Sequence, residues 1–561
     1  MSAGFSLLVG SMLLAFPFFV FLVSSVGFIF GIPITILHVI LAGGLTAWHL
    51  RKRAEKIFQW DAYQQYKRTG IFGLGLFAAL FAVSWYFYDI SYDGQVYHQE
   101  AVRQLANGWN PVWEYLTREM SQSAFVVYHY AKGPWIYEAA LYKATGQMEG
   151  SKVFNFLLIA ASFFLSWAAT EKSGKLTKRQ AVLVSFLCAC NPVSVYQSLS
   201  FYIDGQLASL MLCLGSLAYM ALREWKDAWL TEFVMAVVLT INVKFTGVVY
   251  VCVGMVIMAG WFYFNHQKQI YKELVVAFSV ALFLGLGVTG YSPYVVNTVF
   301  YGHPFFPLYG AGAQTMDIMT TNSPPAFLKM NMFEKLYMAT FSSSTNRFDL
   351  EPPVVKWPFT MEARELAPFV YGADIRIGGF GPWFSGMIVL SLLIWAVMCF
   401  YGVKERRYGL LAVGGTIFSI LVNPEAWWAR YVPQFWLVPV VTAVIALFDK
   451  KKEIVYLGKA CIIVSLVNVA LVSGAYFIGN LYCTQALNEE LDQLARREES
   501  VRVWFAEFSS NKPRFDRRGV VWEEAGADTA DVSLEYLRYN YLTAIHNWTP
   551  LQVVFQAYKE Q

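Results

Sequence analysis

The sequence predicts an all-α polytopic membrane protein with about 13 transmembrane helices. Apolar residues make up 57% of the 561-residue chain and charged residues only 15%, whereas a soluble domain carries about a quarter charged residues. The apolar residues gather in runs of roughly 17 to 25 residues, long enough to cross a bilayer as helices. Short basic connections alternate with longer ones rich in acidic and aromatic residues, which predicts a chain with two distinct sides.

The first region, residues 1–69, is predicted to be a transmembrane hairpin followed by a cytoplasmic loop. Apolar runs cover 5–29 and 31–49, and the basic sequence RKRAEK follows at 51–56. The first run lacks the basic start and the small-residue cleavage site of a signal peptide, so we expect it to remain as a helix.

Residues 70–300 form the second predicted region, a transmembrane module interrupted by a first external loop at 89–151. Within that loop, residues 94–118 mix apolar and polar residues at helical spacing, and the pattern breaks at Gly108 and Pro111. Such a helix is expected to lie on the membrane surface. The apolar runs of this region are 70–88, 152–170, 181–200, 205–222, 229–243, 245–264 and 274–296.

The remaining regions are a large external loop at 301–380, the C-terminal transmembrane helices at 381–480 and an external tail at 481–561. The tail is charged and helical in pattern over 484–510. The last apolar runs are 381–402, 408–422, 431–448 and 454–479.

Loop charge predicts the orientation. Basic connections are expected on the cytoplasmic side, which places the N-terminus in the cytoplasm and the tail outside. In a bacterium the protein would sit in the inner (plasma) membrane, with its long polar loops in the periplasm. The basic connections are 51–56, 171–179, 223–226, 404–407 and 449–453, and, more weakly, 265–272.

The sequence YDISYDGQVYH at 88–98 carries the strongest candidate site, because carboxylates at the mouth of a membrane span are costly unless they face water, a metal, a cation or a substrate. Asp89 and Asp93 are spaced to share one face of a helical turn and to hold a divalent metal or one proton. The alternative is a pair of solvated carboxylates that cap the next helix. We favour a functional role for Asp93 and a supporting role for Asp89, with His98 and Glu100 close behind.

A second carboxylate, Asp204, also precedes a glycine at the edge of a span, and the triplet Asp-Gly-Gln at 204–206 repeats that at 93–95. Asp204 is predicted either to reach the same cleft as Asp93 or to cap the following helix. If a metal binds, Asp93 and Asp204 are its predicted ligands.

Two cationic residues stand at external helix ends. Lys244 either snorkels to the interface or neutralises an anionic substrate. Arg430 is predicted to bind a phosphate or carboxylate, because guanidinium binds two oxygens at once, the alternative being a structural pair with Glu425. Arg376 has the same two interpretations, with Asp374 as its structural partner.

In the order of these motifs, the chain resembles the GT-C superfamily of polytopic glycosyltransferases, in particular the dolichyl- or polyprenyl-phosphate mannosyl- and aminoarabinose-transferases. The likeness covers 70–310 well and 380–480 loosely. His303 stands where the family pattern has asparagine. The residues that carry the resemblance are SYDGQVYH (91–98), GWNP (108–111), Asp204, KFTG (244–247), GHPFFPLYG (302–310) and ARYVP (429–433).

The resemblance implies a GT-C-like module with amphipathic external helices after its first helix. It implies transfer of a sugar from a polyprenyl-phosphate donor to an acceptor hydroxyl, with inversion and with Asp93 as general base. The acceptor would be a glycan, a lipid or a protein side chain. No organic cofactor and no nucleic acid are expected, and a divalent metal is left open. The predicted substrate-binding residues are Lys244, Arg430, Asp204, His98, Tyr97 and Arg376, and the predicted supporting residues are Asp89, Glu100 and His303.

Two other functions fit the topology. One is a lipid-linked glycan polymerase or ligase. The other is a transporter or flippase of a lipid-linked substrate, which is disfavoured because ionisable residues are nearly absent from the middle of the spans.

Overall fold

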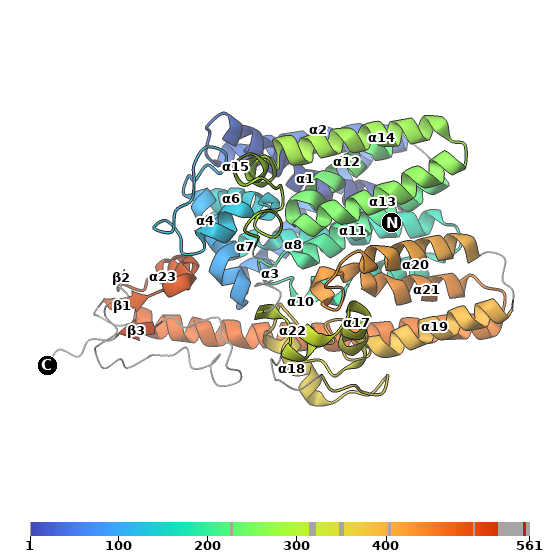
Figure 1. Cartoon of the computed structure of the whole chain (residues 1–561). Coiled ribbons are helices and arrows are strands. Elements are labelled where there is room, and N and C mark those ends of the chain that lie inside the picture. The colour runs from blue at the N-terminus through green and yellow to red at the C-terminus, as the bar shows by residue number, and fades with distance from the viewer. Residues whose placement is uncertain are drawn as a thin grey trace.

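The computed structural model describes residues 2–224, 228–313, 321–346, 353–401, 406–496, 500–524 and 554–556. It confirms the predicted fold class: long helices lie roughly parallel in one bundle (Figure 1). Seven helical segments in the described residues are long and apolar enough to cross a membrane, so the chain is an integral membrane protein. They are Ala3–Ile29, Ile36–Tyr86, Met148–Lys172, Asp204–Arg223, Phe245–Phe264, Lys268–Val288 and Lys452–Ala495.

The N-terminal part of the bundle is built on α1, whose residues are largely buried among its neighbours. Its helices are α1 (Ala3–Ile29), α2 (Ile36–Phe58), α3 (Ala62–Tyr86), α8 (Val153–Lys172), α9 (Lys178–Ala189), α10 (Pro192–Tyr196), α11 (Asp204–Arg223), α12 (Ala228–Val243), α13 (Phe245–Phe264), α14 (Lys268–Leu282) and α15 (Val296–Tyr301).

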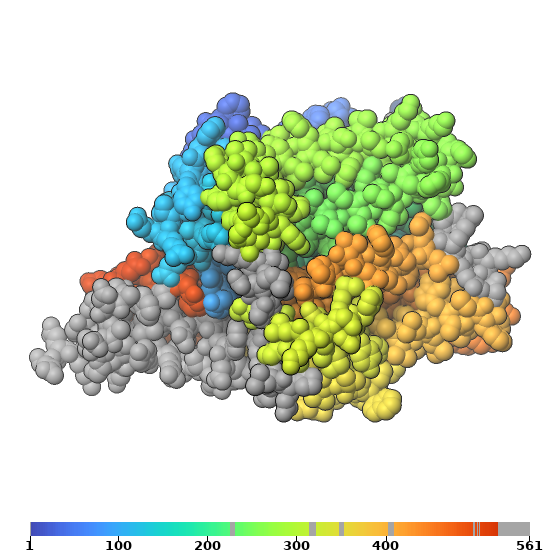
Figure 2. Space-filling view, in the orientation of Figure 1, coloured from blue at the N-terminus to red at the C-terminus, as the bar shows by residue number. Residues whose placement is uncertain are grey.

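A second apolar core joins α9 of the N-terminal part to α19, α21 and α22 of the C-terminal part. The two parts lie against each other, blue to green above and yellow to orange below in Figure 2. The helices of the C-terminal part are α17 (Met332–Phe341), α18 (Ala367–Tyr371), α19 (Phe384–Phe400), α20 (Arg406–Leu421), α21 (Leu437–Leu447) and α22 (Lys452–Ala495).

Several predicted runs differ from the observed helices. The run 274–296 is kinked near its end, where Ser292 has non-helical φ and ψ angles. The run 181–200 is interrupted, because Pro192 begins a new helix, α10, and Asn191 caps it through Val193 N. The last run continues without a break into the tail as α22. At 44 residues this helix is about 66 Å long, more than twice the hydrocarbon thickness. The predicted boundary at residue 480 therefore falls inside a helix.

The first external loop folds into short helices at one end of the bundle. The predicted amphipathic helix is present as α4 but ends at Ala106, where Gly108 takes a positive φ of 107°. Ala101, Val102 and Leu105 form its buried face. The helices of this loop are α4 (Gln99–Ala106), α5 (Ala124–His129), α6 (Gly133–Thr145) and α7 (Met148–Ser151).

The tail adds a small sheet to the otherwise helical molecule, in the order β2-β1-β3. Its β1–β2 pair is parallel and its β1–β3 pair antiparallel. The described part of the tail lies at the same end of the bundle as α4 and α6, whereas the α13–α14 connection and the C-terminal end of α19 lie at the other end (Figure 1). The elements of the tail are β1 (Val501–Trp504), α23 (Lys512–Arg518), β2 (Trp522–Glu524) and β3 (Val554–Gln556).

Candidate functional site

Asp93 and Arg430 form an ion pair between the first external loop and the segment before α21. Asp93 precedes a turn of π-helix, η2 (Gly94–His98), and Arg430 lies in a single 3₁₀ turn, η7 (Ala429–Tyr431). Arg430 Nη1 lies 3.4 Å from Asp93 Oδ2. The Arg430 side chain is 12% exposed and the Asp93 side chain is 23% exposed, so the pair is accessible to solvent or to a ligand.

A second ion pair joins Asp204, the first residue of α11, to Lys244, the residue before α13. Lys244 Nζ lies 2.6 Å from Asp204 Oδ1. Gln197 donates a hydrogen bond to the other carboxylate oxygen at 3.2 Å, and its own Oε1 accepts one from Gly205 N. Asp204 lies in the first turn of α11 but does not cap it, since Ile203 is the N-cap residue and no side chain caps the helix; its carboxylate binds Lys244 and Gln197.

Aromatic rings connect the two ion pairs. Lys244 Nζ lies 4.2 Å from the ring centroid of Tyr431, and Arg430 Cζ lies 5.4 Å from the same ring. Arg430 also stacks on Trp428 at 4.3 Å and contacts Tyr202 at 5.6 Å, distances at which cation–π attraction operates. Asp93, Asp204, Lys244 and Arg430 are therefore brought together by the fold.

Asp374 and Arg376 complete this group. Arg376 Nη2 lies 3.6 Å from Asp374 Oδ2, as the structural interpretation predicts, and Arg430 Nε lies 3.7 Å from Asp374 Oδ1. Burial raises the pKa of Asp374, against the attraction of Arg430 and Arg376. We call these six residues the charged cluster: Asp93, Asp204, Lys244, Asp374, Arg376 and Arg430.

Sequence reasoning treated Asp374 only as a partner of Arg376. Its place between two arginines depends on how 371–382 packs against η7, and the only local signal is an acid in a glycine-rich segment. Tyr202, Trp428 and Tyr431 were likewise missed, because aromatic residues at helix ends are common throughout this chain.

His98 and Tyr97 lie next to the charged cluster. The His98 ring lies 5.9 Å from Tyr202 and 4.3 Å from Tyr97. Trp135 Nε1 donates to His98 Nδ1 at 2.7 Å, so the ring proton of neutral His98 is on Nε2. Burial lowers the pKa of His98 to about 4, which keeps the ring neutral.

Asp89 does not share a face with Asp93. Its carboxylate is fully buried and accepts hydrogen bonds from Ser91 N, Ser91 Oγ and Phe201 N at 2.8, 2.6 and 2.8 Å. These bonds fasten the first external loop to the turn that precedes Asp204. The predicted sharing of one metal by Asp89 and Asp93 is not the arrangement found.

Glu100 and His303 contact other parts of the molecule. Glu100 forms an ion pair with Arg103 at 2.8 Å and accepts a hydrogen bond from Ser509 in the tail. His303 accepts from Phe305 N at 3.1 Å, within the predicted turn at 302–310. Glu425, the alternative partner of Arg430, instead lies 3.6 Å from Lys335.

Within the described ranges, no group of three or more His, Cys, Asp or Glu side chains is placed to hold a metal ion. Asp93 and Asp204, the predicted ligands, each contact a cationic side chain instead.

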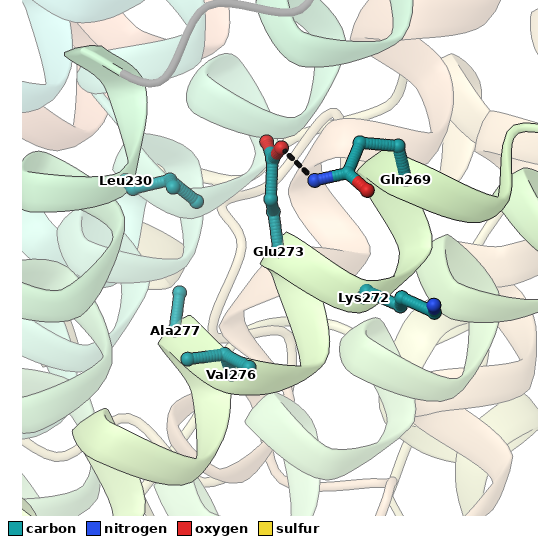
Figure 3. Close-up of a pocket in the computed structure, with 6 residues that line it drawn as sticks. All are labelled: Leu230, Gln269, Lys272, Glu273, Val276 and Ala277. Carbon is teal, nitrogen blue, oxygen red and sulfur yellow. Dashed lines mark hydrogen bonds between the residues drawn. The ribbon is translucent and has the colours of Figure 1, made fainter.

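A separate pocket of about 340 Å³ lies between α12 and α14 (Figure 3). Leu230 is 14 residues from Lys244, about 20 Å along α12, so the pocket is remote from the charged cluster. It is lined by Leu230, Gln269, Lys272, Glu273, Val276 and Ala277.

Comparisons with known proteins add little to the geometry of the charged cluster. No protein-family model matches the chain, and no curated protein matches it. A similar solved structure is that of ArnT from Cupriavidus metallidurans in the apo state, with a TM-score of 0.41 and 13% sequence identity. The alignment covers 81% of this chain and 85% of that chain. A likeness at this level does not establish a shared activity.

Proposed function

We propose that the chain is a membrane glycosyltransferase of the GT-C type. It would transfer a sugar from a polyprenyl-phosphate donor to an acceptor hydroxyl at the non-cytoplasmic face of the membrane, with inversion at the anomeric carbon. The observation that supports this proposal is the meeting of one accessible carboxylate, Asp93, with two cations, Arg430 and Lys244, in the charged cluster.

In the proposed reaction, the acceptor hydroxyl oxygen attacks the anomeric carbon of the donor sugar. Asp93 takes the hydroxyl proton as general base, a role that suits a carboxylate within hydrogen-bond reach. The bond between the anomeric carbon and the phosphate oxygen breaks, and the lipid phosphate leaves with the electron pair. Arg430 and Lys244 stabilise the negative charge of this leaving group.

Arg430 is poised for an additional ligand. Its two carboxylate contacts, at 3.4 and 3.7 Å, are longer than charge-assisted hydrogen bonds of about 2.7–2.9 Å. Its Nε is buried and has no hydrogen-bond partner in the described part of the chain. A phosphate that took both nitrogens would compete with Asp93 for the guanidinium and leave the carboxylate available as a base.

The test is an assay of purified protein with polyprenyl-phosphate sugars. We expect Asp93→Asn to lower kcat by about 10²- to 10⁴-fold and Arg430→Ala by about 10²- to 10³-fold. Asp61→Asn and Arg364→Ala are matched controls, since both residues are exposed and outside the charged cluster. Full activity in a correctly folded Asp93→Asn variant would overturn the assignment of the base.

The same assay tests the predicted metal. A divalent cation bound by Asp93 and Asp204 would have to displace Arg430 and Lys244 from these carboxylates. Activity that is lost in EDTA and restored by Mg²⁺ or Mn²⁺ would assign the two residues as metal ligands. Activity unchanged by EDTA would mean that Arg430 and Lys244 supply the positive charge at the site.

A further inference from the structure

The C-terminal tail packs directly behind the loop that carries Asp93. The segment consists of the 3₁₀ helix η9 (Ala506–Asn511) and α23 (Lys512–Arg518). η9 packs against η2 and α4, and α23 packs against η9 and α22, at the same end of the bundle as α4 (Figure 1). Tyr88 from the loop also shares an apolar cluster with Phe505 and Phe515 of the tail. The two segments are more than 400 residues apart in the sequence.

Arg514 is the central residue of this contact. It is buried, with 5% of its side chain exposed, and each of its three guanidinium nitrogens donates at least one hydrogen bond. Nε and Nη2 bind Glu149 Oε1 at 2.9 and 2.6 Å, and Nη2 also donates to the carbonyl of Asp89 at 2.8 Å. Nη1 donates to Asn511 Oδ1 at 2.7 Å and to Gln95 Oε1 at 3.3 Å.

Glu149 connects Arg514 to the backbone of the loop. While its Oε1 binds Arg514, its Oε2 accepts a hydrogen bond from Asp89 N at 3.0 Å. The N–H of Asp89 is therefore held by Glu149 and its C=O by Arg514, the two members of one buried ion pair. Glu149 Oε2 also lies 2.5 Å from Nζ of buried Lys152, so loss of Arg514 would leave Glu149 with one cation but would remove the donor to the Asp89 carbonyl.

Three further tail residues bind the loop on either side of Asp93. Ser510 Oγ donates to the carbonyl of Gln95 at 2.5 Å, and Asn511 donates to the Gln95 side chain at 3.1 Å. Tyr92 donates to Glu507 at 2.8 Å. The residues before and after Asp93 are thus held by the tail, while Asp93 itself points to Arg430.

We propose that Arg514 is a positioning residue, which sets the place of Asp93 opposite Arg430 by holding the backbone at Asp89 and the side chain of Gln95. The proposal rests on the proposed function in so far as it assigns Asp93 a role in catalysis. It also gives the tail a function: the tail completes the candidate active site from outside the membrane.

The test compares Arg514→Ala and Arg514→Lys with Arg517→Ala in the full-length protein. Arg517 is exposed on the same helix and stacks on Trp85, so it controls for loss of charge and for changes in α23. We expect Arg514→Ala to lower kcat by about 10- to 100-fold, since a displacement of about 1 Å can cost 10²-fold, with the donor KM within about twofold. Arg514→Lys should recover only part of kcat, because an ammonium has three donors and no fork.

Hydrogen–deuterium exchange supplies a measurement that does not depend on activity. Peptides covering 87–100 should exchange faster in Arg514→Ala than in the wild type, whereas their exchange rate should be unchanged in Arg517→Ala. Unaltered kcat in Arg514→Ala, or faster exchange spread evenly over the bundle, would overturn the proposal. If the wild-type protein transfers no sugar, the proposed function fails, and exchange in 87–100 alone decides whether Arg514 positions the loop.

Discussion

At the scale of single residues, the feature with the clearest consequence for pH is the neutral ring of His98. It is 1% exposed, accepts a hydrogen bond from Trp135 and has a pKa lowered to about 4 by burial. In the unfolded chain its pKa would be about 6.5. Between these two values the unfolded state binds more protons than the folded state, so the contribution of His98 to stability is present above pH 6.5 and is lost as the pH falls toward 4.

The substitution His98→Gln should remove this dependence while it keeps an acceptor for Trp135. The difference between the two pKa values, about 2.5, corresponds to about 3 kcal/mol. Between pH 6.5 and pH 4, the free energy of unfolding should therefore fall by up to about 3 kcal/mol more in the wild type than in the variant. Denaturant unfolding in detergent micelles across this range measures it. Parallel curves for the two proteins would show that His98 does not titrate as described.

At the scale of elements, the Asp93 loop is shaped by a close approach at a glycine. Asp89 accepts hydrogen bonds from Ser91 and Phe201, and Gly94 folds back onto the Asp89 carboxylate. A Cβ on Gly94 would overlap Asp89 Oδ2 and Ser91 Oγ. The glycine of the second Asp-Gly-Gln triplet, Gly205, also lies at a close approach. A Cβ on Gly205 would lie 2.8 Å from Cα of Ser194.

We therefore expect Gly94→Ala to destabilise the fold by about 1–3 kcal/mol and to lower transfer activity, because the added methyl displaces the support of Asp93. Gly75→Ala in α3 is the matched control. No atom lies within 4 Å of a Cβ there, so alanine should be neutral or stabilising by about 1 kcal/mol. Thermal denaturation and the transfer assay measure both. Equal effects at the two positions would contradict the steric explanation.

At the scale of the whole molecule, the charged cluster lies where the two parts of the bundle meet. Asp93, Asp204 and Lys244 come from the N-terminal part, and Asp374, Arg376 and Arg430 from the C-terminal part. A second buried ion pair holds the N-terminal part together at a different place. Arg53 of α2 lies 2.6 Å from Glu232 of α12, which also accepts a hydrogen bond from Ser11 of α1 at 2.6 Å.

Removing one member of that pair should destabilise the bundle. Glu232 is 0% exposed, so Glu232→Ala leaves the guanidinium of Arg53 buried without its partner, at a cost of about 3–5 kcal/mol. Glu55→Ala, in the same helix as Arg53, is the control. Glu55 is 41% exposed, and its pairs with Arg51 and Lys52 are surface pairs that contribute little to stability. The comparison is made by denaturation in micelles, and a Glu232→Ala variant as stable as Glu55→Ala would refute it.

Much of the fold follows from the sequence, because a bilayer imposes strong constraints on it. Spans need a minimum length of apolar residues and must satisfy their backbone hydrogen bonds internally, so the long helices were predictable. The length of α22 and the break at Pro192 were not, since hydropathy does not show where a helix continues beyond the membrane or stops within an apolar run.

The candidate site was only partly predictable. The cost of charge at a membrane boundary singled out Asp93, Asp204, Lys244 and Arg430 before any contact was known. It could not separate Asp89 from Asp93, because a carboxylate that fastens backbone and one that faces a cation look alike in sequence. It also gave no reason to look in the tail for Arg514.

The sequence by itself determined the helical membrane class and the residue types at the helix ends. Only the tertiary structure decided which of these residues meet: Asp93 with Arg430, Asp204 with Lys244, and Arg514 behind the loop. The physical reason is that lipid and protein interior are equally apolar, so hydropathy places a helix across the membrane but does not select its lateral neighbours.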